Sequence, residues 1–137
     1  MNVIDASALS KFILKEAGWE AVAGYLVNSL SVDHVLKEVS NAIWKAFRRG
    51  FIDVEDSTRK FSALITLLRA NLELVNEVEI LPSAFDLALK HGITVYDALY
   101  VELAREKGLP LVTCDETQAK VARDEGVEIV LLKAKPP

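Results

Sequence analysis

Short apolar runs that are followed at once by an aspartate and then by a helical stretch recur along this chain. Residues 3–4 precede Asp5, and residues 109–114 precede Asp115. Because strands that alternate with helical stretches favour a parallel sheet flanked by helices, this arrangement predicts an α/β fold. Ligands of such sheets bind in the crevice outside the carboxyl ends of the strands, so both aspartates are expected at one edge of one sheet.

The size and composition of the chain suit one folded domain. Its 137 residues match the usual length of a single domain, and a hydrophobic fraction of 51% argues against disorder. No apolar run reaches the roughly 20 residues of a membrane span, and the amino terminus lacks a secretory signal. We therefore expect one domain over residues 1–132 with a short tail over 133–137, a cytoplasmic location and no membrane partner.

The charge of the chain limits how it could hold nucleic acid. Residues 1–70 carry nine basic and eight acidic side chains, whereas residues 71–137 carry seven and twelve. This is not the strongly basic signature of a protein that binds nucleic acid by charge alone. A chain of this charge that acts on a phosphate backbone needs positive charge from elsewhere, which bound divalent cations would supply. Cys114 is the only cysteine, so no internal disulfide and no thiol-based zinc site is expected.

Hydrophobic periodicity predicts the order of the elements. The expected strands cover about residues 1–4, 30–32, 74–75, 109–114 and 127–131. The expected helices cover about residues 6–14, 18–29, 35–47, 53–72, 82–91, 94–107 and 116–125. Proline suits the first turn of a helix, so Pro82 is expected to start the helix that Gly92 ends.

Four acidic residues lie where the crevice of such a sheet is expected, namely Asp5, Glu38, Asp97 and Asp115. Each also has a purely structural explanation. The three aspartates suit the first turns of helices, where Asp115 with Gln118 and Thr94 with Asp97 resemble capping boxes. Glu38 suits the solvated flank of an amphipathic helix. The conjunction of all four at one sheet edge favours a functional site.

Four carboxylates in one crevice point to a hard cation. They would repel one another, and without a counter-charge the pKa of at least one would rise. Mg²⁺ or Mn²⁺ would relieve the repulsion, since Mg²⁺ prefers a few carboxylates plus several waters. Asn41 follows Glu38 by three residues on the same helical face, where its amide suits the surroundings of such a cation. Two cations could align an attacking water and stabilise a leaving oxygen in phosphodiester cleavage.

The ordered set of motifs resembles the PIN-domain nucleases, in particular the VapC toxins of prokaryotic toxin–antitoxin pairs. The resemblance covers almost the whole chain and rests on residues 3–8, Glu38-x-x-Asn41, residues 91–100 and residues 108–115. It implies a three-layer α/β/α sandwich with a central, mainly parallel sheet. It also implies an Mg²⁺- or Mn²⁺-dependent endoribonuclease that hydrolyses RNA phosphodiester bonds with a metal-activated water. The implied partners are a second copy of the chain, in a homodimer or higher homo-oligomer, and a small cognate antitoxin protein.

The same resemblance assigns roles to single residues. It makes Asp5, Glu38, Asp97 and Asp115 the acidic quartet around the metal, some as direct ligands and others through water. Ser7 and Thr113 become hydroxyls that hydrogen-bond a carboxylate or a metal-bound water, and Asn41 becomes a support for Glu38. Ordinary roles for the two hydroxyls, as a first-turn polar residue and a strand residue, stay open.

Other classes of function also stay open. A catalytically silent PIN-like module would bind RNA or protein, although an intact acidic quartet argues against it. A receiver-like phosphoacceptor would need a lysine after the late strand, where this chain has Asp115. Trp19, Trp44 and Tyr96 could stack bases, although core packing is the simpler expectation for the two tryptophans.

Overall fold

Five parallel strands form one sheet in the order β3-β2-β1-β4-β5. The protein is seen here as a computed structural model that describes residues 1–132, so the tail expected over 133–137 lies outside the described residues. The strands are β1 (Asn2–Ile4), β2 (Ser29–Val32), β3 (Leu72–Val75), β4 (Leu111–Thr113) and β5 (Ile129–Leu131). The parallel sheet that the alternating pattern predicted is confirmed.

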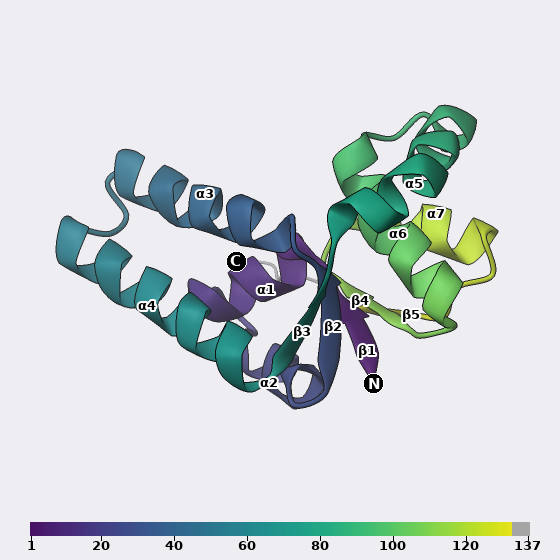
Figure 1. Ribbon diagram of the computed structural model, residues 1–137. Helices are drawn as coiled ribbons and strands as arrows, with labels where there is room; N and C mark the ends of the chain where they lie inside the picture. Colours follow the sequence, from purple (N-terminus) through teal and green to yellow (C-terminus); the bar gives the residue numbers. More distant parts are fainter. Residues whose placement is uncertain (133–137) are drawn as a thin grey trace.

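Helices cover both faces of this sheet, with α1–α4 gathered on one side and α5–α7 on the other (Figure 1). They are α1 (Ala6–Ile13), α2 (Glu20–Leu26), α3 (Val35–Arg48), α4 (Val54–Ala70), α5 (Glu77–His91), α6 (Val95–Lys107) and α7 (Glu116–Asp124). The fold is therefore the three-layer α/β/α sandwich that the resemblance implied. Along residues 1–132, each helix is too short or too polar to cross a bilayer.

The strand order creates a switch point between β1 and β4. The chain builds β1, β2 and β3 outward in one direction and then places β4 and β5 on the opposite side of β1. Val3 pairs with Leu111 and Ile4 with Val112, so the carboxyl ends of the two strands lie next to each other. Asp5 directly follows β1 at this point. Open α/β sheets bind their ligands in the crevice at such a switch point.

Strand β2 supports this edge although it contains polar residues. All four of its residues are buried, and Ser31 is fully enclosed. Burying an unpaired hydroxyl costs free energy, but the Ser31 hydroxyl donates a 2.6 Å hydrogen bond to the carbonyl of Ile4. This bond fixes the end of β1 one residue before Asp5.

Helix α5 begins earlier than the sequence pattern indicated. Asn76 is its N-cap and accepts a 2.9 Å hydrogen bond from the Val78 amide, while Asp33 accepts one of 3.0 Å from the Glu77 amide. Pro82 therefore lies inside the helix, and the expectation that it marks the first turn is wrong. The capping hydrogen bonds outweigh the local cost of an interior proline, which lacks an amide donor.

The two tryptophans lie in different environments. Trp19 is half-buried and packs edge-on against Phe12, with ring centroids 5.8 Å apart. Trp44 is 54% exposed on α3, so the expectation of core packing is wrong for this residue. Helical spacing alone does not decide which side of α3 packs against α1 and α4, because both of its flanks carry apolar residues.

Candidate active site

Asp5 is the centre of a buried polar network at the end of β1. It is the N-cap of α1, and its Oδ1 accepts hydrogen bonds from the Ala8 amide at 2.9 Å and the Ser7 hydroxyl at 2.7 Å. Its Oδ2 accepts a short hydrogen bond from the Thr113 hydroxyl. The residue is 0% exposed. Burial raises the pKa of Asp5 to about 6, although all three hydrogen bonds oppose this rise.

Ser7 and Thr113 join β1, α1 and β4 around this carboxylate. The Thr113 hydroxyl also accepts a 3.0 Å hydrogen bond from the Asp115 amide, and the Ser7 hydroxyl accepts one of 2.8 Å from the Cys114 amide. The two hydroxyl oxygens lie 3.3 Å apart. Each hydroxyl thus bonds both the Asp5 carboxylate and the loop that leads from β4 into α7.

Asp97 and Asp115 are linked through Gln118. Asp115 caps α7 by accepting hydrogen bonds from the amides of Thr117 and Gln118 at 2.7 and 3.2 Å. The Gln118 side chain does not return to the Asp115 amide, but donates a 3.0 Å hydrogen bond to Oδ1 of Asp97. Asp97 in turn donates its amide to the Thr94 hydroxyl at 3.2 Å. Each of the two expected capping boxes is therefore wrong in one of its two hydrogen bonds. The side chains of Gln118 and Asp97, which were expected to return to the amides of Asp115 and Thr94, instead bond each other across the contact between α6 and α7.

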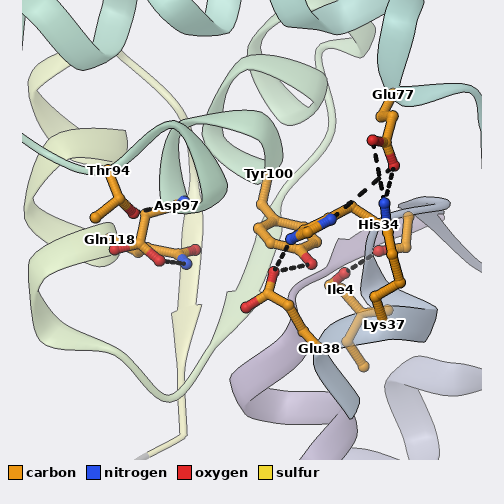
Figure 2. A network of polar contacts seen from close by, with 10 residues as sticks. Ile4, His34, Lys37, Glu38, Glu77, Thr94, Asp97, Tyr100 and Gln118 are labelled. Carbon is orange, nitrogen blue, oxygen red and sulfur yellow. Dashed lines mark hydrogen bonds and ion pairs between the residues drawn. The ribbon is translucent and has the colours of Figure 1, made fainter. Parts of the chain in front are cut away.

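Glu38, the fourth acidic residue, lies on α3 and is held by a hydrogen bond from Tyr100. The Tyr100 hydroxyl donates a 2.6 Å hydrogen bond to Oε1 of Glu38, and Nε2 of His34 lies 3.4 Å from the same oxygen (Figure 2). Tyr100 is fully buried. Burial raises the pKa of Glu38, the hydrogen bond from Tyr100 lowers it, and the charge of Asp97 raises it further.

The four carboxylates influence one another electrostatically. The charge of Asp115 contributes to the raised pKa of Asp5, and that of Asp97 to the raised pKa of Glu38. Burial raises the pKa of Tyr100 first, and the charges of Glu38, Asp5 and Asp97 raise it further. The charges of three of the four predicted site residues therefore act on the Tyr100 hydroxyl.

The side chains do not yet converge on a single point. Within residues 1–132, no three His, Cys, Asp or Glu side chains are placed so that they could hold one metal ion together. Asn41 is exposed beside Glu38 in the same cavity, and no hydrogen bond joins the two side chains. The structure therefore brings the acids to one edge of the sheet without fixing which of them would share a cation.

The donors that are present suit a hard divalent cation. They are carboxylate and amide oxygens, which Mg²⁺ and Mn²⁺ prefer over sulfur ligands. Oε1 of Gln118 is buried and, among the described residues, has no hydrogen-bond partner. An unpaired buried carbonyl next to a carboxylate is costly unless a water or an ion reaches it.

Three contacts of the site were missed in the sequence. Tyr100 follows Asp97 by three residues, so helical spacing alone put both on one face of α6. His34 precedes Glu38 by four residues, which is the same kind of signal. Gln118 had been explained as part of a cap, and only the packing of α7 against α6 revealed its bond to Asp97.

The Tyr100→Phe substitution is expected to lower the activity of this site by about tenfold, the lower end of the effect of removing a hydrogen-bond partner from a metal-ligating side chain. The phenyl ring keeps the packing, but Glu38 loses the hydrogen bond that lowers its pKa. The acidic limb of the pH–rate profile should therefore move to higher pH. Rates measured from pH 5 to 9 check this, and a uniform loss without any shift of the profile would contradict the role of the hydroxyl.

Comparison with known proteins identifies the family. The PIN domain family model matches residues 3–124. Ribonuclease VapC3 of Pyrobaculum aerophilum is 38% identical over 122 residues, which cover 86% of this chain and 92% of the relative. Exonuclease VapC9 of the same organism is 30% identical over 133 residues, with coverages of 96% and 93%. The crystal structure of VapBC-5 from Mycobacterium tuberculosis, a member of the VapBC family of toxin–antitoxin systems, matches with a TM-score of 0.61 at 16% identity, over 96% of this chain and 98% of that one. The chain therefore belongs to the PIN-domain family and is related within it to the VapC proteins.

Proposed function

We propose that this protein is a VapC-type ribonuclease, the toxin of a toxin–antitoxin pair, and that residues 1–132 form its single PIN domain. It hydrolyses RNA phosphodiester bonds with a water that Mg²⁺ or Mn²⁺ activates. The observation that carries the proposal is the fully buried Asp5 carboxylate, held by Ser7 and Thr113 at the switch point of the sheet. The 38% identity to ribonuclease VapC3 supports the same activity.

The proposed ligands are Asp5, Glu38, Asp97 and Asp115, and each keeps at least one lone-pair position that accepts no hydrogen bond. A carboxylate offers about four lone-pair positions, of which Asp5 uses three. Among the described residues, Oδ2 of Asp97, Oδ2 of Asp115 and Oε2 of Glu38 accept no hydrogen bond. Because no three of these groups converge as they stand, a cation that three of them ligate directly would require at least one of them to change its rotamer.

The bound cation would lower the pKa of a coordinated water and neutralise the charge of the scissile phosphate. The protein's own part is to hold the carboxylates in place through Ser7, Thr113, Tyr100 and Gln118. The raised pKa of Asp5 supports this arrangement, because a buried carboxylate without a nearby positive charge is held in a costly state.

The proposed partners are a small antitoxin and a second copy of the chain. Support for the antitoxin comes from the similarity to VapBC-5, a member of the VapBC family of toxin–antitoxin systems. Further support comes from apolar side chains exposed around the connection between α3 and α4, namely Trp44, Phe51 and Val54. Support for a homodimer or higher oligomer comes from a second exposed stripe along α5, formed by Val78, Leu81, Phe85 and Leu89. Clustered apolar exposure of this kind marks interaction sites more often than free surface.

Incubation of the wild-type protein with one defined RNA, in linear and circular form, tests the activity. Cleavage is expected with Mg²⁺ or Mn²⁺ and should fall at least ~100-fold in EDTA, since the cation would be needed to activate the attacking water. Cleavage of the circular RNA would show that the protein is an endoribonuclease, whereas digestion of the linear form alone would show that it is an exonuclease. Binding of RNA without cleavage under every metal condition would favour the catalytically silent module.

A further inference from the structure

A cavity lies beside Glu38, and none of the three aspartates of the acidic quartet lines it. It has a volume of about 380 Å³ and is lined by His34, Lys37, Glu38, Asn41 and Tyr96, which we call the Tyr96 pocket. This volume lies in the lower part of the roughly 300–1,000 Å³ that small-molecule sites occupy. Glu38 forms one wall, so an occupant of the pocket would lie directly next to the proposed cleavage centre.

Tyr96 forms a supported aromatic platform in this pocket. Its ring stacks on that of His34 with centroids 4.9 Å apart and planes 9° from parallel. His34 is only 12% exposed, and it is held between Glu38 at 3.4 Å and Glu77 at 4.0 Å (Figure 2). Tyr96 itself is 59% exposed. One face of the tyrosine ring is therefore backed by a fixed imidazole, while much of the ring remains open to a planar ligand.

Asn41 adds a polar group that can read the edge of such a ligand. Its amide is exposed in the pocket and has no hydrogen-bond partner among residues 1–132. A carboxamide carries a donor and an acceptor side by side, which is the pattern that pairs with the amino group and ring nitrogen of adenine. Stacking and an amide contact together suit a nucleobase better than a purely apolar ligand.

The charges of the pocket favour a neutral ring over a phosphate at this position. Glu38 forms its wall, and Nζ of Lys37 is paired with Glu77 at 3.2 Å. An anion placed here would meet Glu38 without a free cation from the protein. A neutral base in the pocket would lie next to Glu38, one of the proposed metal ligands, without bringing a second negative charge to it.

We propose that the Tyr96 pocket is a base-binding subsite that stacks one nucleobase of the RNA, with adenine preferred, beside the scissile phosphate. Tyr96 provides the stacking surface and Asn41 contacts the edge of the base. This inference rests on the proposed ribonuclease function, since it assigns part of the substrate to the same site. It makes Tyr96 and Asn41 determinants of where the RNA is cut.

The first test measures binding without cleavage. Adenosine, which is neutral, is titrated in EDTA into the wild-type protein and into each variant, while the NMR signals of the Asn41 side-chain amide, which all of these proteins retain, are followed. A saturable shift of these signals is expected. Tyr96→Ala should weaken adenosine binding by about 5- to 150-fold, the usual worth of base–aromatic stacking. Tyr96→Phe keeps the ring and should bind normally, whereas Phe61→Ala removes an exposed aromatic outside the pocket and serves as control. The absence of any saturable shift would overturn the subsite.

The second test separates the subsite from the activity itself. An RNA that is cut at one place is compared with RNAs that lack the base on either side of that place. Loss of one of these bases should lower kcat/KM of the wild type by about the same factor as Tyr96→Ala does on the intact RNA. When Tyr96→Ala acts on the RNA without that base, kcat/KM should fall no further than with either change alone, because both changes remove the same contact. Additive losses would refute the base contact while leaving the ribonuclease intact. If no RNA is cut in any metal, the proposed function fails, and the adenosine titration still decides the subsite.

Discussion

Replacement of Asp5 by asparagine is expected to lower RNA cleavage at least ~100-fold while making the metal-free protein more stable near neutral pH. Loss of a partner outside the ligand shell commonly costs 10–100-fold, so loss of a ligand should cost no less. Asparagine can keep the hydrogen-bond network. Its carbonyl can accept from Ser7 and Ala8, and its amide can donate to the Thr113 hydroxyl, which has two acceptor positions.

The gain in stability follows from the ionisation of Asp5. The pKa of Asp5 is about 6 in the folded protein, against 3.8 for an unperturbed aspartate. Between these values the folded state binds more protons than the unfolded state, so the free energy of unfolding of the wild type falls as pH rises from about 4 to 6. A shift of this size is worth about 3 kcal/mol. Asparagine does not ionise, so its advantage over the wild type should be small at pH 4 and largest above pH 6.

Urea unfolding in EDTA at several values between pH 4 and 8 measures this difference. Asp53→Asn is the matched control, because Asp53 is also an aspartate N-cap but is exposed on α4, outside the site. Addition of Mg²⁺ should raise the melting temperature of the wild type and of Asp53→Asn but not that of Asp5→Asn, since only a cation bound to the native state stabilises it. An Asp5→Asn protein that cuts RNA at the wild-type rate, or a stability difference that does not change with pH, would contradict the assignment.

Replacement of Thr113 by valine is expected to destabilise the protein by about 2–3 kcal/mol at pH 7.5, the usual loss when a hydrogen bond to a charged group is removed. The shapes of the two side chains are nearly the same, so packing changes little. The Thr113 hydroxyl, however, donates to Asp5 and accepts from the Asp115 amide, and both are left without it. Because this bond lowers the pKa of Asp5, its loss should raise that pKa further and should cost more above pH 6 than at pH 4.

Thr117→Val provides the control, because Thr117 is exposed on α7. Its free energy of unfolding should stay within about 0.5 kcal/mol of the wild type, as is usual for surface substitutions. In the Asp5→Asn background, Thr113→Val should cost clearly less than in the wild type, since the charged acceptor is gone. Equal costs in the two backgrounds would show that Thr113 acts through packing and not through Asp5.

Much of the fold could be predicted because it depends on local signals. The apolar run at residues 109–114 predicted a strand, and the glycines that follow the helical stretches predicted where helices end. Both predictions are close to the observed elements, and the strand expected over residues 30–32 is β2 over Ser29–Val32. The start of α5 could not be predicted in this way. It depends on Asn76 and on Asp33, which lies 44 residues away from the Glu77 amide that it accepts.

The residues of the site also divide into those that local signals predicted and those that only long-range contacts revealed. The three aspartates were visible because each directly follows a strand or lies in the first turn of a helix, which is also where caps are favoured, whereas Glu38 was identified by its position on a helix face with Asn41. Asp5 both caps α1, by accepting from the Ala8 amide, and accepts a hydrogen bond from Thr113 in the buried polar network. The partners of Asp97 and Glu38 were harder to find, since Gln118 and Tyr100 come from 21 and 62 residues away.

The sequence by itself determined the order of the elements, the parallel sheet and the identity of the four acids, because periodicity, capping preference and motif spacing are written in neighbouring residues. Only the tertiary structure decided how those acids are held. Burial of Asp5 raises its pKa, and the packing of α6 against β1, β2 and α7 brings Tyr100 to Glu38 and Gln118 to Asp97. Desolvation and long-range hydrogen bonds depend on which surfaces meet in space, and no local pattern in the chain encodes them.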